Sequence, residues 1–166
     1  MDIGRVLRHL LTPSWVLGRT FTPDVLAAIA EAVEASEAHH RGEIRFAVEA
    51  GLDLAELLRG TTTRARAIEV FSRLRVWDTE ENTGVLIYVQ WLDRRVEIVA
   101  DRGIARQVPQ AAWASVCRQM EAAFVEGRFR AGSVAAVAAV GELLARAFPP
   151  GPDNPNELPD RPVLLR

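Results

Sequence analysis

The spacing of apolar residues changes several times along the chain, and three segments have the spacing of β-strands. Residues 43–49 alternate apolar and polar side chains, which is typical of a strand. Residues 85–91 are apolar on both faces, which indicates a strand that is covered on both sides. Asp93 and Arg94 then allow a tight turn into residues 95–101, which return with one polar face. This pattern predicts a hairpin whose second strand lies at an edge or is half exposed.

Segments with helical spacing precede, separate and follow these strands. The predicted helices are residues 2–11, Thr22 to about His39, Thr62 or Thr63 to about Arg75, one that begins at Pro109, and residues 132–148. Thr22 can cap the second helix, and Pro23 suits its first position. The helix after Thr62 carries Ile68 and Phe71 on its predicted buried stripe. A strand, a helix and a second strand in this order favour a right-handed crossover between parallel strands.

The two ends of the chain differ from the α/β region between them, which we place at residues 20–149. Residues 1–19 are predicted to form a basic amphipathic helix, over Asp2–Leu11, and a linker. Such a helix can contact a membrane surface or dock on a partner, and it can also pack on its own domain or on a second copy, which we expect here. Residues 150–166 are rich in proline, glycine, aspartate and asparagine, so we predict a disordered tail.

Composition excludes some classes of protein, but it does not indicate a function. The chain has 166 residues, enough for one domain, and 25% of them are charged. The formal net charge of −2 provides no field that would attract nucleic acid or anionic lipid to the whole chain. Cys117 is the only cysteine, so an intrachain disulfide is excluded. With no signal-peptide pattern and no apolar segment long enough to span a bilayer, the sequence predicts a cytoplasmic protein.

Acidic and amide side chains gather around the predicted strand starts. If the strands at residues 43–49 and 85–91 are parallel, their starts lie at one end of the sheet, and the hairpin returns its second strand there. The oxygen-bearing candidates are Glu43, Asp78, Glu80, Glu81, Asn82 and Asp101. Hard cations such as Ca²⁺ and Mg²⁺ prefer oxygen ligands, so we predict a divalent-cation site at this end. The alternative is that residues 78–81 are a solvated loop and that Asn82 and Gly84 only shape the turn.

Arg45 and Arg102 raise the question of catalysis, because either could hold a phosphoryl oxygen beside a metal-activated water. No nucleophile motif, nucleotide-binding loop or zinc-binding motif accompanies them. His39 and His40 are adjacent, but three histidines in the whole chain do not favour a zinc site. We therefore predict a non-catalytic interaction or accessory domain with an unidentified protein partner. A metal-dependent phosphatase is the alternative.

Several segments, in their order and spacing, resemble the TPM domain, a family that includes YgcG-like bacterial proteins and plant thylakoid-lumen proteins associated with photosystem II repair. The segments that carry the resemblance are Thr22-Pro23-Asp24, residues 43–49, Ala67-Ile68-Glu69-Val70-Phe71, residues 82–89, residues 93–98, and residues 123–129 followed by Gly132. The resemblance covers about residues 20–149. It implies a Rossmann-like α/β fold, a three-layer α/β/α sandwich on a small mixed sheet, to which this chain adds its N-terminal helix.

The resemblance implies more than one function. Some members are described as acid phosphatases, some bind divalent cations such as calcium, and others act as accessory domains. The chain departs from the commoner pattern, because Glu81-Asn82-Thr83-Gly84 stands where members often have Asp-Asn-Gly, and Asp101-Arg102-Gly103 stands in place of Gly-x-Gly. Many members also carry a signal peptide and a membrane anchor, which this sequence does not show. These departures argue against an inherited phosphatase activity and against a location outside the cytoplasm.

Overall fold

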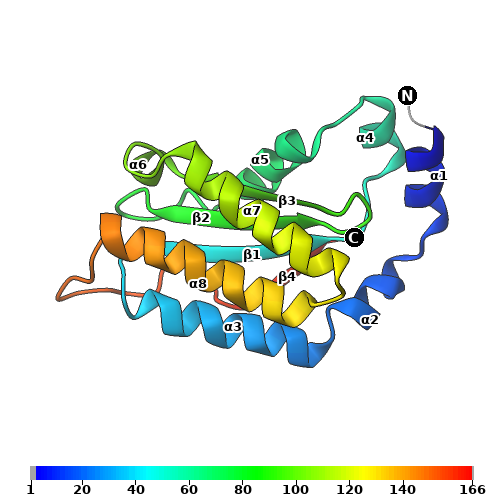
Figure 1. The fold of residues 1–166 in the computed structure, drawn as a ribbon. Coiled ribbons are helices and arrows are strands. Elements are labelled where there is room, and N and C mark those ends of the chain that lie inside the picture. The colour runs from blue at the N-terminus through cyan, green and yellow to red at the C-terminus, as the bar shows by residue number, and fades with distance from the viewer. Residues whose placement is uncertain (1–2, 166) are drawn as a thin grey trace.

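A mixed sheet of four strands lies at the centre of the computed structural model, which describes residues 3–165 (Figure 1). The strands are β1 (Glu43–Glu49), β2 (Gly84–Gln90), β3 (Arg95–Ala100) and β4 (Val163–Leu165), in the order β3-β2-β1-β4. β1 and β2 run parallel, with Glu43 opposite Gly84 and Glu49 opposite Gln90, so the predicted crossover is confirmed. β2 and β3 form the predicted antiparallel hairpin, and β3 is an edge strand.

Helices cover both faces of the sheet, which produces the three-layer α/β arrangement that the sequence predicted (Figure 1). One face packs against α3 (Pro23–Glu37), α7 (Gln110–Val125) and α8 (Phe129–Ala147), and the other packs against α5 (Thr63–Arg73). The shorter helices are α1 (Ile3–Leu11), a 3-10 turn at Ser14–Val16, α2 (Leu17–Thr20), α4 (Leu54–Leu58) and α6 (Arg102–Ala105).

Side-chain alternation along the two central strands explains why both faces of the sheet need cover. Every residue of β1 and β2 is buried. On β2, Val85, Ile87 and Val89 join a larger core beneath α3, α7 and α8, whereas Leu86 and Tyr88 join a smaller core beneath α5. Apolar burial of this kind contributes roughly 25 cal/mol per Å². The two cores therefore hold the starts and ends of these strands in fixed positions.

The helix on the second face has a slightly different orientation from the one that the sequence predicted. Thr62 caps α5, because its hydroxyl oxygen accepts the Ala65 N–H over 3.1 Å. Ile68, which the spacing placed on the buried stripe, is 48% exposed, so this part of the prediction is wrong. Val70, fully buried, takes the inward position beside Phe71. α5 is therefore rotated so that Ile68 lies on its outer face.

α1 lies at the end of the sheet where β1 and β2 terminate, and it packs beside α4 (Figure 1). The predicted helix began at Asp2, which lies outside the described residues. Within residues 3–165, no helix is both long and apolar enough to cross a bilayer.

The C-terminal segment is ordered against the sheet, and the prediction of a disordered tail over residues 150–166 is wrong for the part that the structure describes. Val163–Leu165 forms β4, which pairs in parallel with β1. Leu158 and Leu165 are buried in the smaller core. These apolar anchors and the free edge of β1 offset the entropy lost on ordering a segment rich in proline and polar residues. Arg166 lies outside the described residues.

Candidate functional site

The loop before β2 has a defined shape that its own residues impose. The Thr83 N–H donates to Thr79 Oγ1 over 2.9 Å. Asn82 has a φ of 56°, a left-handed conformation that asparagine tolerates better than most residues. A Cβ at Gly84 would lie 1.8 Å from the Val76 carbonyl oxygen, so the close approach of these two segments requires glycine. The oxygen-rich loop is therefore held in one conformation.

The turn into α6 meets this loop directly. The Gly103 N–H donates to the Asn82 carbonyl oxygen over 3.2 Å, and Arg102 Nε donates to Asn82 Oδ1 over 3.1 Å. A Cβ at Gly103 would lie 2.5 Å from the Asn82 carbonyl oxygen and 2.8 Å from that of Glu81, so a larger residue would displace the loop. We call residues 81–83 together with residues 101–103 the amino edge, because β1 and β2 begin beside them. The structure thus brings Asn82, Asp101 and Arg102 together.

Asp101 has an acceptor atom that the described residues leave without a donor. Its Oδ1 accepts the Arg102 N–H over 2.7 Å and caps α6. Its Oδ2 is shielded from solvent and has no hydrogen-bond partner within residues 3–165. A buried carboxylate oxygen without a donor or a cation is costly, so a cation would be favourable beside this atom.

The other acidic side chains of the loop do not gather around Asp101. Asp78, Glu80 and Glu81 are exposed, and Glu81 forms an ion pair with Arg41. In the described part of the chain, no three carboxylate, imidazole or thiol side chains are placed to hold a metal ion together. A cation at the amino edge would therefore depend on Asp101, on main-chain carbonyl oxygens and on the Asn82 amide.

Glu43 and Arg45, which the sequence placed beside the same site, anchor the C-terminal segment instead. The Leu158 N–H donates to Glu43 Oε2 over 3.0 Å, and Arg45 Nη1 donates to the Arg161 carbonyl oxygen over 2.6 Å. Burial under this segment raises the pKa of the Glu43 carboxyl. Both side chains are therefore engaged by a part of the chain that the sequence predicted to be disordered.

Glu37, at the end of α3, is a titratable group that sequence reasoning did not include in the site. Its Oε1 accepts the Ile44 N–H over 2.7 Å. Burial raises the pKa of Glu37 to about 8, and the charges of Glu43 and Asp160 act in the same direction, while the hydrogen bond from Ile44 opposes them. The Glu37 carboxyl is therefore mainly protonated at neutral pH.

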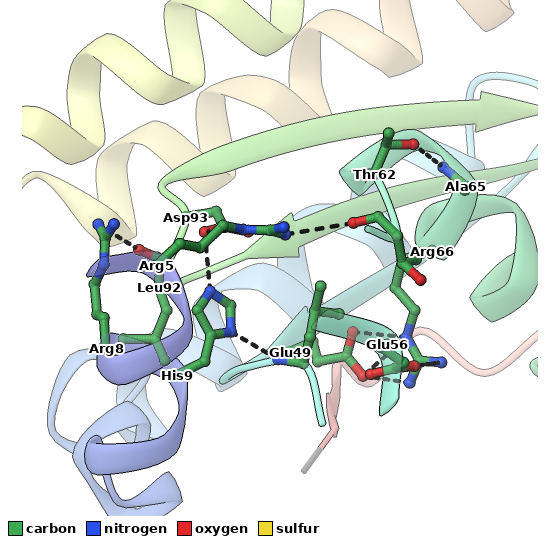
Figure 2. Close-up of polar contacts among 12 residues, drawn as sticks. Arg5, Arg8, His9, Glu49, Glu56, Thr62, Ala65, Arg66, Leu92 and Asp93 are labelled. Atoms are coloured by element: carbon green, nitrogen blue, oxygen red, sulfur yellow. Dashed lines mark hydrogen bonds and ion pairs between the residues drawn. The ribbon is translucent and has the colours of Figure 1, made fainter. Parts of the chain in front are cut away.

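The opposite end of the sheet holds a network of buried charges (Figure 2). Arg66 on α5 makes a two-point contact with Glu49 at the end of β1, from Nε to Oε2 over 2.9 Å and from Nη2 to Oε1 over 2.6 Å. Arg66 also forms an ion pair with Glu56, and the Tyr88 hydroxyl donates to Glu49 Oε2. We call these four residues the carboxyl edge, because β1 and β2 end beside them. Sequence reasoning did not predict this network. The one indication in the sequence was that Arg66 directly precedes Ala67, which is buried, so that Arg66 lies near the inward face of α5.

α1 is attached to the same end of the sheet by polar side chains (Figure 2). Arg5 Nη2 lies 2.8 Å from Asp93 Oδ2, and Arg5 Nε also donates to this carboxylate. His9 Nδ1 accepts the Leu52 N–H over 2.9 Å, so Nε2 carries the ring hydrogen and donates it to Asp93 Oδ1 over 2.9 Å. The turn between β2 and β3 thus holds α1 through one shared carboxylate.

A serine in the last turn of α3 lies close to a histidine just beyond that helix, but the histidine has the wrong tautomer to act as a base. His40 Nε2 lies 2.9 Å from Ser36 Oγ, and His40 Nδ1 accepts the Gly42 N–H. Nε2 therefore carries the hydrogen and cannot take a proton from the serine. Burial raises the pKa of the Cys117 thiol to about 12, so this side chain is not a thiolate at neutral pH.

Comparison with known proteins agrees with this fold. A family model described as the TPM domain matches residues 17–143. Among solved structures, the chain is similar to the NMR structure of the BA42 protein from the psychrophilic bacterium Bizionia argentinensis. The TM-score is 0.75 and the sequence identity is 30%, with 86% of this chain and 94% of the other covered. A search of curated proteins found no match. Because the family model spans most of its length, the chain belongs to the TPM domain family.

Proposed function

We propose that this TPM domain is a non-catalytic accessory domain that binds a divalent cation at the amino edge. The observation that supports the site is Asp101 Oδ2, which is buried and has no donor in the described part of the chain. On the same edge, the Glu81 carbonyl oxygen faces Gly103, and Asn82 Oδ1 accepts a hydrogen bond from Arg102 Nε. Carboxylate, carbonyl and amide oxygens are the ligands that hard cations take in proteins.

These ligands suit Ca²⁺ better than Mg²⁺, and they are expected to bind it weakly. Ca²⁺ accepts about 6–8 oxygens in flexible geometry, whereas Mg²⁺ demands a near-ideal octahedron. Asp101, the Glu81 carbonyl and the Asn82 amide would supply part of this shell, and water would supply the rest. The exposed carboxylates of Asp78 and Glu80 add negative charge nearby. A site with so few protein ligands is expected to have a Kd of about 10⁻⁴–10⁻³ M for Ca²⁺.

Calorimetric titration of the full chain with CaCl₂ tests this site. We expect heat of binding and a melting temperature that rises with Ca²⁺ until the site is saturated. Asp101→Asn should abolish both effects, because asparagine still caps α6 but lacks the charge. Asp153→Asn removes an exposed carboxylate from the C-terminal segment and should bind Ca²⁺ as the parent does. Absence of heat with the parent chain, or unchanged binding by Asp101→Asn, would end the proposal of a cation site.

The non-catalytic part of the proposal rests on other residues. The Cys117 thiol is protonated at neutral pH, and His40 presents a hydrogen to Ser36 rather than a lone pair. We expect no turnover of p-nitrophenyl phosphate, with or without Ca²⁺ or Mg²⁺. Turnover that a chelator removes, and that Asp78→Ala or Asp101→Asn lacks, would overturn this part and support a metal-dependent phosphatase. An unidentified protein partner and a cytoplasmic location stay predictions from the sequence.

A further inference from the structure

The three leucines of α1 face away from the domain, whereas an ordinary surface helix turns its large apolar side chains inward. The exposed fractions are 50% for Leu7, 51% for Leu10 and 73% for Leu11. Arg5 and His9 face inward and bind Asp93 (Figure 2). The helix therefore uses its polar side for attachment and presents its leucines to the outside.

Trp15, in the turn after α1, is also exposed. Its exposed fraction is 59%, and the Arg19 guanidinium carbon lies 4.6 Å from the centre of its ring. We call Leu7, Leu10, Leu11 and Trp15 the N-terminal apolar surface. Four large apolar side chains within nine residues are more than the scattered exposed residues of an ordinary surface, so this surface is expected to be covered by something.

The segment that carries the N-terminal apolar surface is positively charged, unlike the whole chain. Residues 3–20 contain Arg5, Arg8 and Arg19 and no aspartate or glutamate, whereas the formal net charge of the full chain is −2. Arg8 and Arg94 are exposed and line one hollow between α1 and the end of α7. Leucine and tryptophan side chains bordered by arginines are complementary to anionic lipid headgroups.

We propose that α1 lies in the plane of an anionic membrane surface, with the N-terminal apolar surface inserted among the headgroups. The leucines would enter the boundary between headgroups and acyl chains, and Trp15 suits the same depth because its ring is apolar with one polar edge. Arg8, Arg19 and Arg94 would contact lipid phosphates. The bonds of Arg5 and His9 to Asp93 keep α1 on the sheet, so membrane contact does not require the helix to leave its domain.

A second copy of the chain fits this surface less well than a membrane does. α1 has 9 residues and is about 13 Å long. A stable interface between proteins buries about 800 Å² on each partner. Three exposed leucines and one tryptophan provide less area than that. The membrane proposal has no such requirement, because insertion of a few apolar side chains combines with electrostatic attraction.

Co-sedimentation of the full chain with lipid vesicles tests the proposal. We expect binding to vesicles of equal parts phosphatidylglycerol and phosphatidylcholine, and little binding to phosphatidylcholine alone. The triple variant Leu7→Ser/Leu10→Ser/Leu11→Ser should bind at least about tenfold more weakly, and Arg8→Gln about fivefold. Ile68→Ser is the matched control, because Ile68 is a similarly exposed apolar residue on α5, and it should bind as the parent does. Circular dichroism checks that each variant is folded.

Tryptophan fluorescence provides a second measurement, which shows which part of the chain touches the membrane. Addition of anionic vesicles should shift the emission of the parent to shorter wavelength, and Trp15→Phe should remove most of that shift. Trp77 is 49% exposed in the loop that leads to the amino edge, so Trp77→Phe should keep the shift. Absence of binding to anionic vesicles, or equal binding by the triple variant, would overturn the proposal. A parent dimer that the triple variant converts to a monomer would also overturn it, since a second copy would then cover the surface.

Discussion

The two ends of the sheet are built from similar residues but differ in how their charges are paired. At the carboxyl edge, Arg66 is bound to Glu49 and Glu56, and the Tyr88 hydroxyl donates to Glu49. At the amino edge, Asp101 keeps one buried carboxylate oxygen without a donor among the described residues. The paired charges of the carboxyl edge therefore stabilise the fold, whereas the unpaired carboxylate oxygen of the amino edge is available to a ligand.

This assignment reverses the usual expectation for an α/β sheet. Ligands of open α/β sheets commonly bind beyond the carboxyl ends of the strands. Here that end holds the Glu49–Arg66 pair, and α1 is fastened beside it through Asp93. The spare acceptor lies at the end where the parallel strands begin. Substitutions that remove a charge at either end therefore test whether the two ends differ in this way.

The largest effect is expected from Arg66→Met at the carboxyl edge. This change leaves Glu49 and Glu56 buried without their cation, and breaking a buried pair in this way costs about 3–5 kcal/mol of unfolding free energy. Urea unfolding of the two chains measures the difference. Glu69→Gln is the matched control, because Glu69 also pairs with Arg66 but its side chain is 60% exposed, and it should cost less than about 0.5 kcal/mol. If the Arg66→Met variant were as stable as the control, the carboxyl edge would not be the stabilising network described above.

A smaller effect is expected from the buried carboxyl of Glu37. Its pKa is about 8 in the folded chain and about 4.5 when exposed, so the folded state holds a proton that the unfolded state has lost. Stability from this group is complete below pH 4.5 and is lost as the pH rises through about 8. We expect roughly 2–4 kcal/mol less unfolding free energy at pH 9 than at pH 4.5 from this cause.

Glu37→Gln should flatten that part of the pH profile, because glutamine keeps the acceptor for the Ile44 N–H and cannot ionise. Glu34→Gln, an exposed glutamate on the same helix, should leave the profile unchanged. Chemical unfolding at several pH values measures both. A parent profile that is flat over this range, or one that Glu37→Gln does not alter, contradicts the assignment. Since Glu43 and Asp160 interact with Glu37, the measured step belongs to the group of carboxyls together.

The strand pairing could be predicted from the sequence because it depends on local pattern. Residues 85–91 are apolar on both faces, and only a strand with cover on each side satisfies such a pattern. Parallel pairing with β1 then followed from the helix between the two strands, and it brought Asn82 to the same end as Asp101 and Arg102. This part of the site could be predicted from the direction of the strands alone.

The rest of the site depended on contacts that no local pattern contains. The composition of the C-terminal segment is typical of disorder, yet Leu158 and Leu165 bury enough apolar surface to hold it against β1. Because that segment was predicted to be disordered, Glu43 was assigned to the cation site, and Arg45 was assigned to hold a phosphoryl oxygen beside it. Their actual partners, Leu158 and Arg161, lie in that segment. The Glu49–Arg66 pair was missed for a related reason, because period and spacing do not show which charged residues meet in the interior.

The smallest effect is expected at the amino edge, from Arg102→Gln. Arg102 is exposed and donates to Asn82 Oδ1, so its positive charge competes with any cation that uses the same amide oxygen. An exposed charge at this range is worth up to about 1 kcal/mol, so we expect Ca²⁺ to bind about two- to fivefold more tightly to the variant. Calorimetry at low ionic strength measures the change, and added salt should reduce it. Arg106→Gln removes an exposed arginine just beyond α6 and should leave the affinity unchanged. If Arg102→Gln weakened Ca²⁺ binding instead, Arg102 would hold the Asn82 side chain in the orientation that the ion needs. In that case Asp101 Oδ2 would be the one acceptor at the amino edge that is available to a cation without the help of Arg102.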